Sequence, residues 1–235
     1  MKIAIMQPYF LPYVGYFSLV KASDLWIVFD SVQFIRHGWI ERNRILNPNG
    51  EWQYIKVPLI KKKRGTKIND MEIRTTEKWK SKILSQLICY KKAPFYIEII
   101  KFLEEAFNEE FDSIVEQNVH LLKNICSYLK IDFNFEIYSD KIYSIEDKIN
   151  GPGDWAFEIT KFHNANHYIN PIDGEDLFDK AKFKSCDIQL SFLQNNLMPY
   201  PQFQNHFTSG LSIIDVLMFN DPIKTNEIID SYKIN

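Results

Sequence analysis

Residues 2–34, KIAIMQPYFLPYVGYFSLVKASDLWIVFDSVQF, decide the fold of this protein. The stretch opens with a short apolar run and is interrupted by Pro8 and Pro12. It resumes with helical spacing at Gly15 and ends in a second apolar run that starts at Leu25. Because proline neither donates to a sheet ladder nor fits inside a helix, the two prolines predict a rigid loop. The order strand, loop, helix, strand predicts an α/β fold with a Rossmann-like, mostly parallel sheet flanked by helices.

The loop between the first strand and its helix is the first candidate site. In an open α/β sheet, ligands bind beyond the carboxyl ends of the strands, where helix N-termini carry partial positive charge. At Gly15 the missing Cβ would let backbone N–H groups come close to an anion, so Gly15→Val should abolish ligand binding and leave the fold largely intact. The residues expected to face this site are Gln7, Pro8, Tyr9, Tyr13, Gly15 and Tyr16.

Size and composition point to one domain with an aromatic cavity. A chain of 235 residues favours a single α/β domain over residues 1–235. Aromatic residues make up 15% of the chain, which exceeds what a core of this size needs. Sugar rings pack their apolar C–H faces on aromatic planes, so the surplus predicts a carbohydrate-binding cavity.

Charge and cysteine usage exclude several classes. The net charge is −2 and the largest basic run covers only residues 61–64, so nucleic-acid binding is not expected. Cys89, Cys126 and Cys186 form neither a zinc spacing nor a disulfide framework, and no metal site is predicted. The absence of a signal pattern and of a membrane-spanning run predicts a cytoplasmic protein with reduced thiols and no membrane insertion.

A polar run follows the second apolar run. Its planar, multiply donating side chains suit an anionic ligand, because guanidinium groups bind phosphate or carboxylate oxygens in pairs. A polar loop anchored by Trp39 is the alternative. Lys56, in a strand predicted over residues 52–58, either holds a phosphate or faces water. The candidate ligand-binding residues here are Asp30, Gln33, Arg36, Trp39, Arg42, Asn43, Arg44 and Lys56.

The middle and the end of the chain complete the α/β pattern. Apolar spacing predicts a helical insert at about residues 76–130, whose stripes are core packing. The insert consists of helices over residues 76–90, 94–108 and 112–129, with Asp112 as the N-cap of the third. Further strands are expected over residues 68–74, 133–138, 167–170 and 188–193, and further helices over residues 154–163, 212–219 and 221–232.

The loop before residue 212 is a second candidate site. Ser212 could cap the following helix and leave its N–H groups free for a ligand phosphate. An ordinary capped helix is the alternative. The candidate residues in this region are Tyr200, Gln202, His206, Thr208, Ser209 and Ser212.

Several separated motifs resemble the WbqC-like protein family. They are MQPYFLPYVGYF, SVQF, RHGWIERNRI, WQYIKVPL, YPQF and FTSGLSIIDVLMFN, in this order. A more distant likeness links QPYFLPYVGYFSL to the HxGH region of nucleotidyltransferases such as pantothenate synthetase. Gly15 falls on the glycine of that motif, while Tyr13 and Tyr16 replace its histidines. TSGLS is similar to the TxGIS signature of cytidylyltransferases.

The resemblance implies a role in the biosynthesis of bacterial surface polysaccharide, such as the O-antigen of lipopolysaccharide. It implies a transferase that forms an amide by acyl or aminoacyl transfer to a nucleotide-linked amino sugar. ATP or an activated acyl donor, such as an acyl carrier protein, would supply the acyl group. His37 or His206 would be the general base, and Cys186 could carry the acyl group covalently. The alternative, favoured by the missing histidines, is a non-catalytic module that binds a nucleotide sugar and presents it to partner enzymes.

Overall fold

The computed structural model describes residues 1–49, 51–203 and 206–235. Its strands are β1 (Lys2–Met6), β2 (Leu25–Val28), β3 (Arg42–Leu46), β4 (Trp52–Lys56), β5 (Phe135–Ile137), β6 (His167–Pro171), β7 (Gln189–Asn195) and β8 (Tyr232–Ile234). Its α-helices are α1 (Val14–Lys21), α2 (Trp79–Gln86), α3 (Tyr96–Phe107), α4 (Ile114–Leu129), α5 (Pro152–Phe162), α6 (Lys180–Lys184), α7 (Ile213–Phe219) and α8 (Pro222–Ile229). The 3₁₀ segment η5 (Ile172–Leu177) follows β6.

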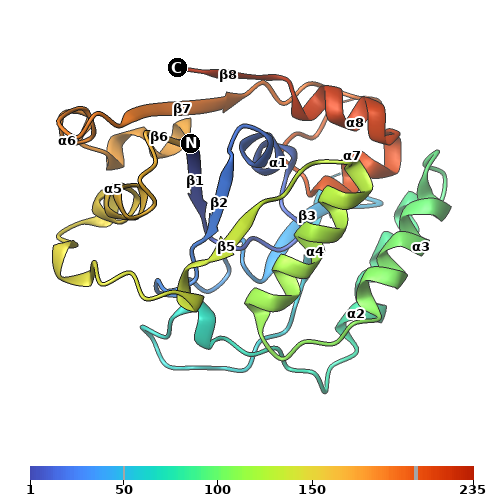
Figure 1. The fold of residues 1–235 in the computed structure, drawn as a ribbon. Coiled ribbons are helices and arrows are strands. Elements are labelled where there is room, and N and C mark those ends of the chain that lie inside the picture. The colour runs from blue at the N-terminus through green and yellow to red at the C-terminus, as the bar shows by residue number, and fades with distance from the viewer. Residues whose placement is uncertain (50, 204–205) are drawn as a thin grey trace.

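One sheet with the strand order β5-β2-β1-β6-β7-β8 forms the centre of the molecule (Figure 1). All its pairings are parallel except that of β8, which runs antiparallel to β7. The expected Rossmann-like α/β fold with a mostly parallel sheet is thereby confirmed. The central strands β1 and β2 are nearly continuous apolar runs, as expected where helices cover both faces of a parallel sheet.

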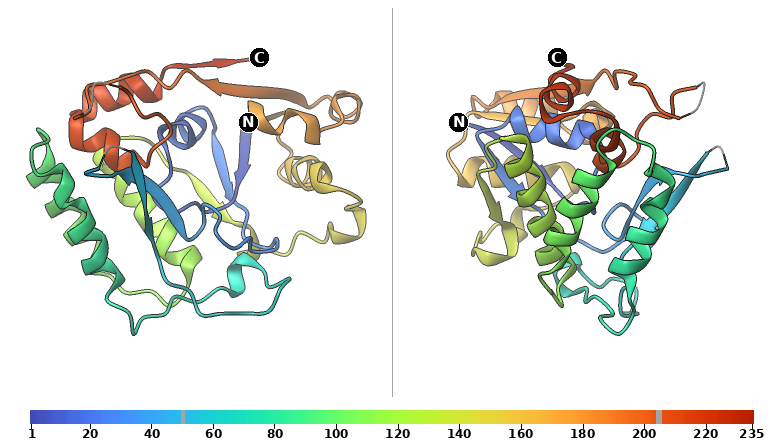
Figure 2. Two further views of the ribbon diagram at one scale, coloured as in Figure 1. Left: turned by 180° about the vertical axis from the view of Figure 1, so that it is seen from behind. Right: turned by 90° about the vertical axis from the view of Figure 1, so that its right-hand side faces the viewer.

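Alternate residues of the strands supply two separate cores. Ala4 and Trp26 belong to the larger core, whereas Ile3 and Leu25 belong to the smaller one on the other face. Helices α1, α4, α7 and α8 contribute to the larger core, and α5 and α6 to the smaller. Figures 1 and 2 show these two groups of helices on opposite sides of the sheet.

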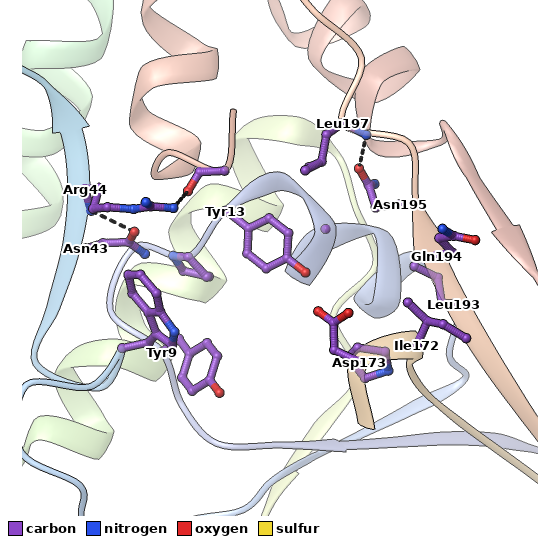
Figure 3. Close-up of a pocket in the computed structure, with 15 residues that line it drawn as sticks. Tyr9, Tyr13, Asn43, Arg44, Ile172, Asp173, Leu193, Gln194, Asn195 and Leu197 are labelled. Carbon is purple, nitrogen blue, oxygen red and sulfur yellow. Dashed lines mark hydrogen bonds between the residues drawn. The ribbon is translucent and has the colours of Figure 1, made fainter. Parts of the chain in front are cut away.

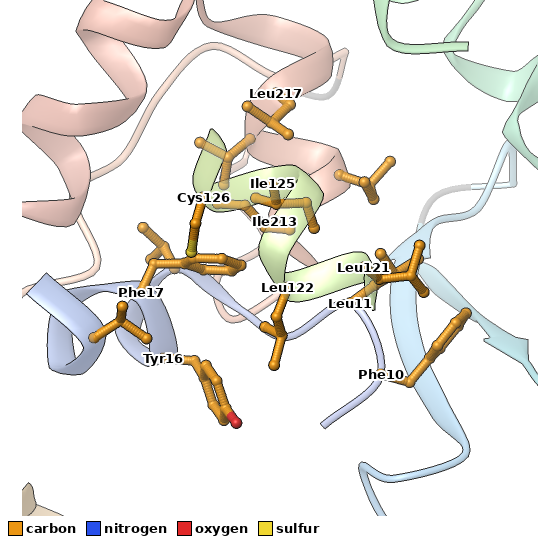
Figure 4. Packing of buried hydrophobic residues seen from close by; sticks show 14 of the residues in the cluster. Phe10, Leu11, Tyr16, Phe17, Leu121, Leu122, Ile125, Cys126, Ile213 and Leu217 are labelled. Carbon is orange, nitrogen blue, oxygen red and sulfur yellow. The ribbon is translucent and has the colours of Figure 1, made fainter. Parts of the chain in front are cut away.

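The larger core fixes the loop after β1. Phe17 of α1, Leu122 of α4 and Ile213 of α7 are fully buried, and Figure 4 shows them together with Phe10 and Leu11 of that loop. Burying one such side chain stabilises the fold by about 1.5–3 kcal/mol. The loop after β1 is therefore a rigid part of the core.

A separate hairpin, β3–β4, lies against the same loop (Figure 2). The buried amide of Asn43 donates to the carbonyl oxygens of Phe10 and Leu11 at 3.1 and 2.9 Å. Phe10 N donates to Trp39 O at 2.8 Å. These bonds hold the hairpin at the carboxyl edge of the main sheet.

Some local predictions were wrong. The strand expected over residues 68–74 is a 3₁₀ turn, Ile68–Asp70, followed by isolated bridges, because Ile73 pairs with Leu59 while Glu72 pairs with Ser113. Ser113, not Asp112, caps α4, since its hydroxyl accepts from Val115 N. The strand β3 begins within the polar run, where no strand was predicted, and β8 was not anticipated.

The longest helix, α4, has 16 residues. Within residues 1–49, 51–203 and 206–235, no helix combines the length and the apolar character that crossing a bilayer requires.

Candidate functional site

A cavity of about 370 Å³ lies beyond the carboxyl ends of β1, β6 and β7. The chain goes from β1 to β2 and β5 on one side and returns to β6 on the other side of β1, so the cavity lies at the point where the strand order reverses. Ligands of open α/β sheets bind at such a switch point. The lining residues are Tyr9, Pro12, Tyr13, Gly15, Trp39, Asn43, Arg44, Pro171, Ile172, Asp173, Leu193, Gln194, Asn195, Leu197 and Gly210 (Figure 3).

Three segments that are distant in the sequence form one wall of the cavity. Ser212 N donates to Arg44 O at 2.8 Å, and Ile213 N donates to Pro12 O at 2.8 Å. Ser212 Oγ donates to Leu11 O at 2.7 Å. The structure thus brings together the loop after β1, the β3 strand and the turn before α7.

Arg44 supplies the positive charge of this wall. Its guanidinium carbon lies 5.5 Å from the ring centre of Trp39 and 5.3 Å from that of Trp52, within cation–π range. Nη2 donates to Gly210 O at 3.1 Å. Among the described residues, no carboxylate pairs with Arg44. The held guanidinium can therefore bind an anionic group of a ligand.

Tyr13 occupies the space that Gly15 leaves free. A Cβ on residue 15 would lie 2.4 Å from Cε2 of Tyr13, so the ring lies directly over the first turn of α1. The absence of a side chain at Gly15 makes room for the tyrosine ring. The ring, and not an anion, therefore occupies the space that was expected to admit a ligand. A larger residue at this position would move Tyr13 first.

The aromatic side chains carry protonated hydroxyls. Burial raises the pKa of Tyr9. Burial and, to a smaller extent, the carboxylate of Asp173 raise the pKa of Tyr13. Both hydroxyls therefore stay protonated near neutral pH and can donate hydrogen bonds into the cavity.

Other expected residues of the first loop face the core. Tyr16 is buried, its hydroxyl donates to Gln7 O at 2.9 Å, and its ring centre lies 4.7 Å from that of Trp26. Pro8 O accepts the amide of Asn118 at 2.8 Å. These three residues therefore support the loop from its core side and do not line the cavity.

Asp30 holds the end of β2. Its carboxylate is buried and accepts Ser139 N at 3.1 Å and Ser139 Oγ at 2.5 Å. Burial raises the pKa of Asp30, while these hydrogen bonds oppose the shift. The contacts give Asp30 a structural role beside β5.

The remaining members of the polar run point elsewhere. The guanidinium of Arg42 lies 3.9 Å from the ring centre of Tyr54 and donates to His37 O. Lys56 is the backbone partner of Arg42 in the register of the hairpin, and it is exposed. Gln33 and Arg36 line a different groove, together with residues 62–64.

The expected general bases do not lie at the cavity. His37 is exposed, and its backbone N–H donates to a carboxylate oxygen of Glu41. His206 is also exposed. Neither belongs to the described lining of the cavity.

A buried carboxylate that sequence reasoning missed organises the second candidate region. Asp215 is fully buried and accepts hydrogen bonds from the hydroxyl of Tyr90 at 2.6 Å, the hydroxyl of Tyr200 and the amide of Gln202 at 2.7 Å. Gln202 Oε1 in turn accepts Thr208 N at 2.8 Å. Tyr200, Gln202 and Thr208 therefore hold the loop before α7, and Ser209 is exposed outside the lining.

The N-terminus of α7 is not free for a phosphate. Ile213 N donates to Pro12 O, and Ile214 N donates to Ser212 Oγ at 3.3 Å. The alternative interpretation of Ser212, an ordinary buried cap, matches these contacts. Ser212 contributes to the site by holding Leu11 and Arg44 together, while Ile213 N holds Pro12.

Sequence reasoning also missed the wall formed by β6 and β7. Asp173 follows β6, and Gln194 and Asn195 end β7. The rule that pointed to the loop after β1 applies equally to the ends of the other parallel strands, and would have found them. Within the described residues, no group of three or more His, Cys, Asp and Glu side chains is arranged to hold a metal ion.

Comparisons with known proteins identify the family of this chain. A model of the WbqC-like protein family matches residues 7–227. An uncharacterized protein of Mycobacterium tuberculosis, Rv1507c, is 28% identical over 222 residues, which cover 93% of each chain. No solved structure shows a significant match. Since the family model spans nearly the whole chain, this protein belongs to the WbqC-like protein family.

Proposed function

We propose that this protein takes part in surface-polysaccharide biosynthesis by forming an amide on a nucleotide-linked amino sugar. The observation that carries the proposal is the cavity at the switch point, where Arg44 lies within cation–π range of two tryptophans and beside further aromatic side chains. The guanidinium would bind a phosphate of the nucleotide-linked sugar. The aromatic planes would pack on the apolar face of its ring.

The size of the cavity suits this ligand. Small-molecule sites enclose about 300–1,000 Å³, and the cavity of about 370 Å³ accommodates one sugar ring with an attached phosphate. Tyr9, Tyr13 and Trp39 provide the apolar surface. The nucleotide would extend from the open side of the cavity toward solvent.

The residues around the cavity favour direct transfer. Among the described lining residues there is no Ser, Thr, Cys, His or Lys that could carry an acyl group or act as a strong base. The ammonium of the acceptor would first lose one proton to solvent; the neutral amine nitrogen would then attack the carbonyl carbon of an activated acyl donor, and the C–N bond would form as the bond to the leaving group breaks. The leaving group would take up the proton lost by nitrogen, while the Tyr13 hydroxyl could donate to the carbonyl oxygen as charge develops there.

Cys186 has no place in this scheme. It is exposed between α6 and the amino end of β7, whereas the cavity lies at the carboxyl ends of the strands. The donor would therefore be a molecule bound with the acceptor, such as an acyl thioester on an acyl carrier protein or an acyl phosphate made from ATP.

A non-catalytic role is the second candidate, and one observation favours it. A described lining without a Ser or Thr hydroxyl, a thiol, a lysine or an imidazole is sufficient to bind a nucleotide sugar but gives little help to chemistry. The protein would then bind the nucleotide sugar and present it to partner enzymes.

Calorimetry and product analysis separate the two candidates. We expect the purified protein to bind a nucleotide-linked amino sugar, and Arg44→Ala to bind it weakly. Amide formed by the wild type from an activated acyl donor, detected by mass spectrometry, would identify an enzyme. Binding without product would favour the presenting module, and no binding of any nucleotide sugar would refute both.

A further inference from the structure

Asp173 gives the cavity a second charged wall. Within the described lining it is the sole carboxylate, and Arg44 is the sole permanently charged cation. Asp173 lies in η5, directly after β6, so the end of a central strand fixes its position. Figure 3 shows its carboxylate on the opposite side of the cavity from Arg44, with the ring of Tyr13 between them.

The carboxylate of Asp173 is available to a ligand. Its neighbour Glu175 pairs with Lys180, but no cation in the described part of the chain pairs with Asp173. Asp173 lines the cavity on the side of the Tyr13 ring (Figure 3), and its charge adds to the effect of burial in raising the pKa of that tyrosine. An unpaired carboxylate that faces an aromatic cavity suits a cationic group of the ligand.

We propose that Asp173 recognises the primary ammonium group of the amino sugar, opposite the phosphate that Arg44 binds. This inference rests on the proposed function and specifies the acceptor. The ligand would be an amino sugar phosphate whose ammonium and phosphate lie at opposite ends of the bound part. The aromatic side chains between the two walls contact the uncharged ring.

Recognition of the ammonium has two consequences. A sugar with a hydroxyl at the same carbon carries no charge and loses the charge-assisted hydrogen bonds to Asp173. The amide product is also uncharged at this nitrogen, so it binds more weakly than the substrate. Asp173 would thus select the acceptor and favour release of the product.

Calorimetry with three matched ligands tests the inference. The ligands are a nucleotide-linked amino sugar, the same compound with a hydroxyl in place of the amine, and its N-acetyl form. We expect the wild type to bind the amine about 10- to 100-fold more tightly than the other two, as charge-assisted hydrogen bonds suggest. Asp173→Asn should bind all three within a few-fold of one another.

Asp176→Asn is the matched control. Asp176 is an exposed carboxylate of the same η5 segment that does not line the cavity, so this variant should keep the preference for the amine. The preference of the wild type should also decline as pH rises and the amine loses its proton, whereas the affinity of Asp173→Asn should depend little on pH.

The outcomes distinguish a failure of the role assigned to Asp173 from a failure of the proposed function. If Asp173→Asn keeps the preference for the amine, Asp173 does not recognise the ammonium, yet the proposed function stands. If the wild type binds the amine and the hydroxyl form equally, the inference also fails alone. If the wild type binds none of the three, or binds free amino acids instead, the proposed function fails with it.

Discussion

The buried carboxylate of Asp215 should be a main source of stability for the turn that holds Arg44. Tyr90, Tyr200 and Gln202 all donate to it. Hydrogen bonds to a charged group contribute about 1.5–3 kcal/mol each, and the contributions within one network are not additive. Asp215→Ala leaves two buried hydroxyls without their acceptor, so we expect a loss of about 3–5 kcal/mol in the free energy of unfolding.

Urea denaturation monitored by tryptophan fluorescence measures this loss. Tyr200→Phe removes one donor and should cost about 1–2 kcal/mol. Combined with Asp215→Ala, it should cost almost nothing more, because its partner is already absent. A loss below about 1 kcal/mol for Asp215→Ala, or full additivity of the two changes, would refute the idea that the network holds this region.

The pH dependence of the same network has a definite sign. Burial raises the pKa of Asp215, and the donated hydrogen bonds only partly oppose this shift. The folded state therefore binds the carboxyl proton more tightly than the unfolded state. The stability of the wild type relative to Asp215→Asn should be greatest below the unfolded pKa, about 3.9, and should fall as pH rises through the folded pKa. A relative stability that increases over this range would contradict the direction of the shift.

Two further predictions concern the cavity itself. Arg44→Ala should weaken binding of a nucleotide-linked sugar about 10- to 100-fold in calorimetry, because a charge-assisted contact to phosphate is lost. Arg42→Ala, which removes an equal charge from the same strand but outside the cavity, should change the affinity little, and equal effects would contradict the assignment. Gly15→Ala should displace the ring of Tyr13, with which the new Cβ would overlap. The signals of Tyr13 in NMR should shift, whereas an unchanged environment would show that the backbone moves instead.

The sequence predicted the elements whose signal is local. The apolar runs around Pro8 and Pro12 gave β1, α1 and β2 within a residue or two, because strand and helix periods are read directly from neighbouring residues. The fold class follows from this unit. The position of a cavity beyond β1 also follows, since it depends on topology alone.

The direction of side chains within the site was not predictable in the same way. Arg42 and Arg44 are chemically alike and stand two residues apart on β3, yet only Arg44 lines the cavity and lies within cation–π range of Trp39 and Trp52. The turn before α7 resembles a phosphate-binding helix end, but the loop after β1 already occupies its N–H groups. Such differences depend on contacts between distant segments, about which one sequence carries no direct signal.

The antiparallel pairing of β8 with β7 connects one end of the fold to the cavity. Leu193, Gln194 and Asn195 line the cavity and pair in register with Ile234, Lys233 and Tyr232. A short outer ribbon thus steadies one rim of the cavity. Trimming residues 232–235, or attaching a purification tag directly to them, would loosen that rim and alter ligand affinity without touching any side chain in contact with the ligand.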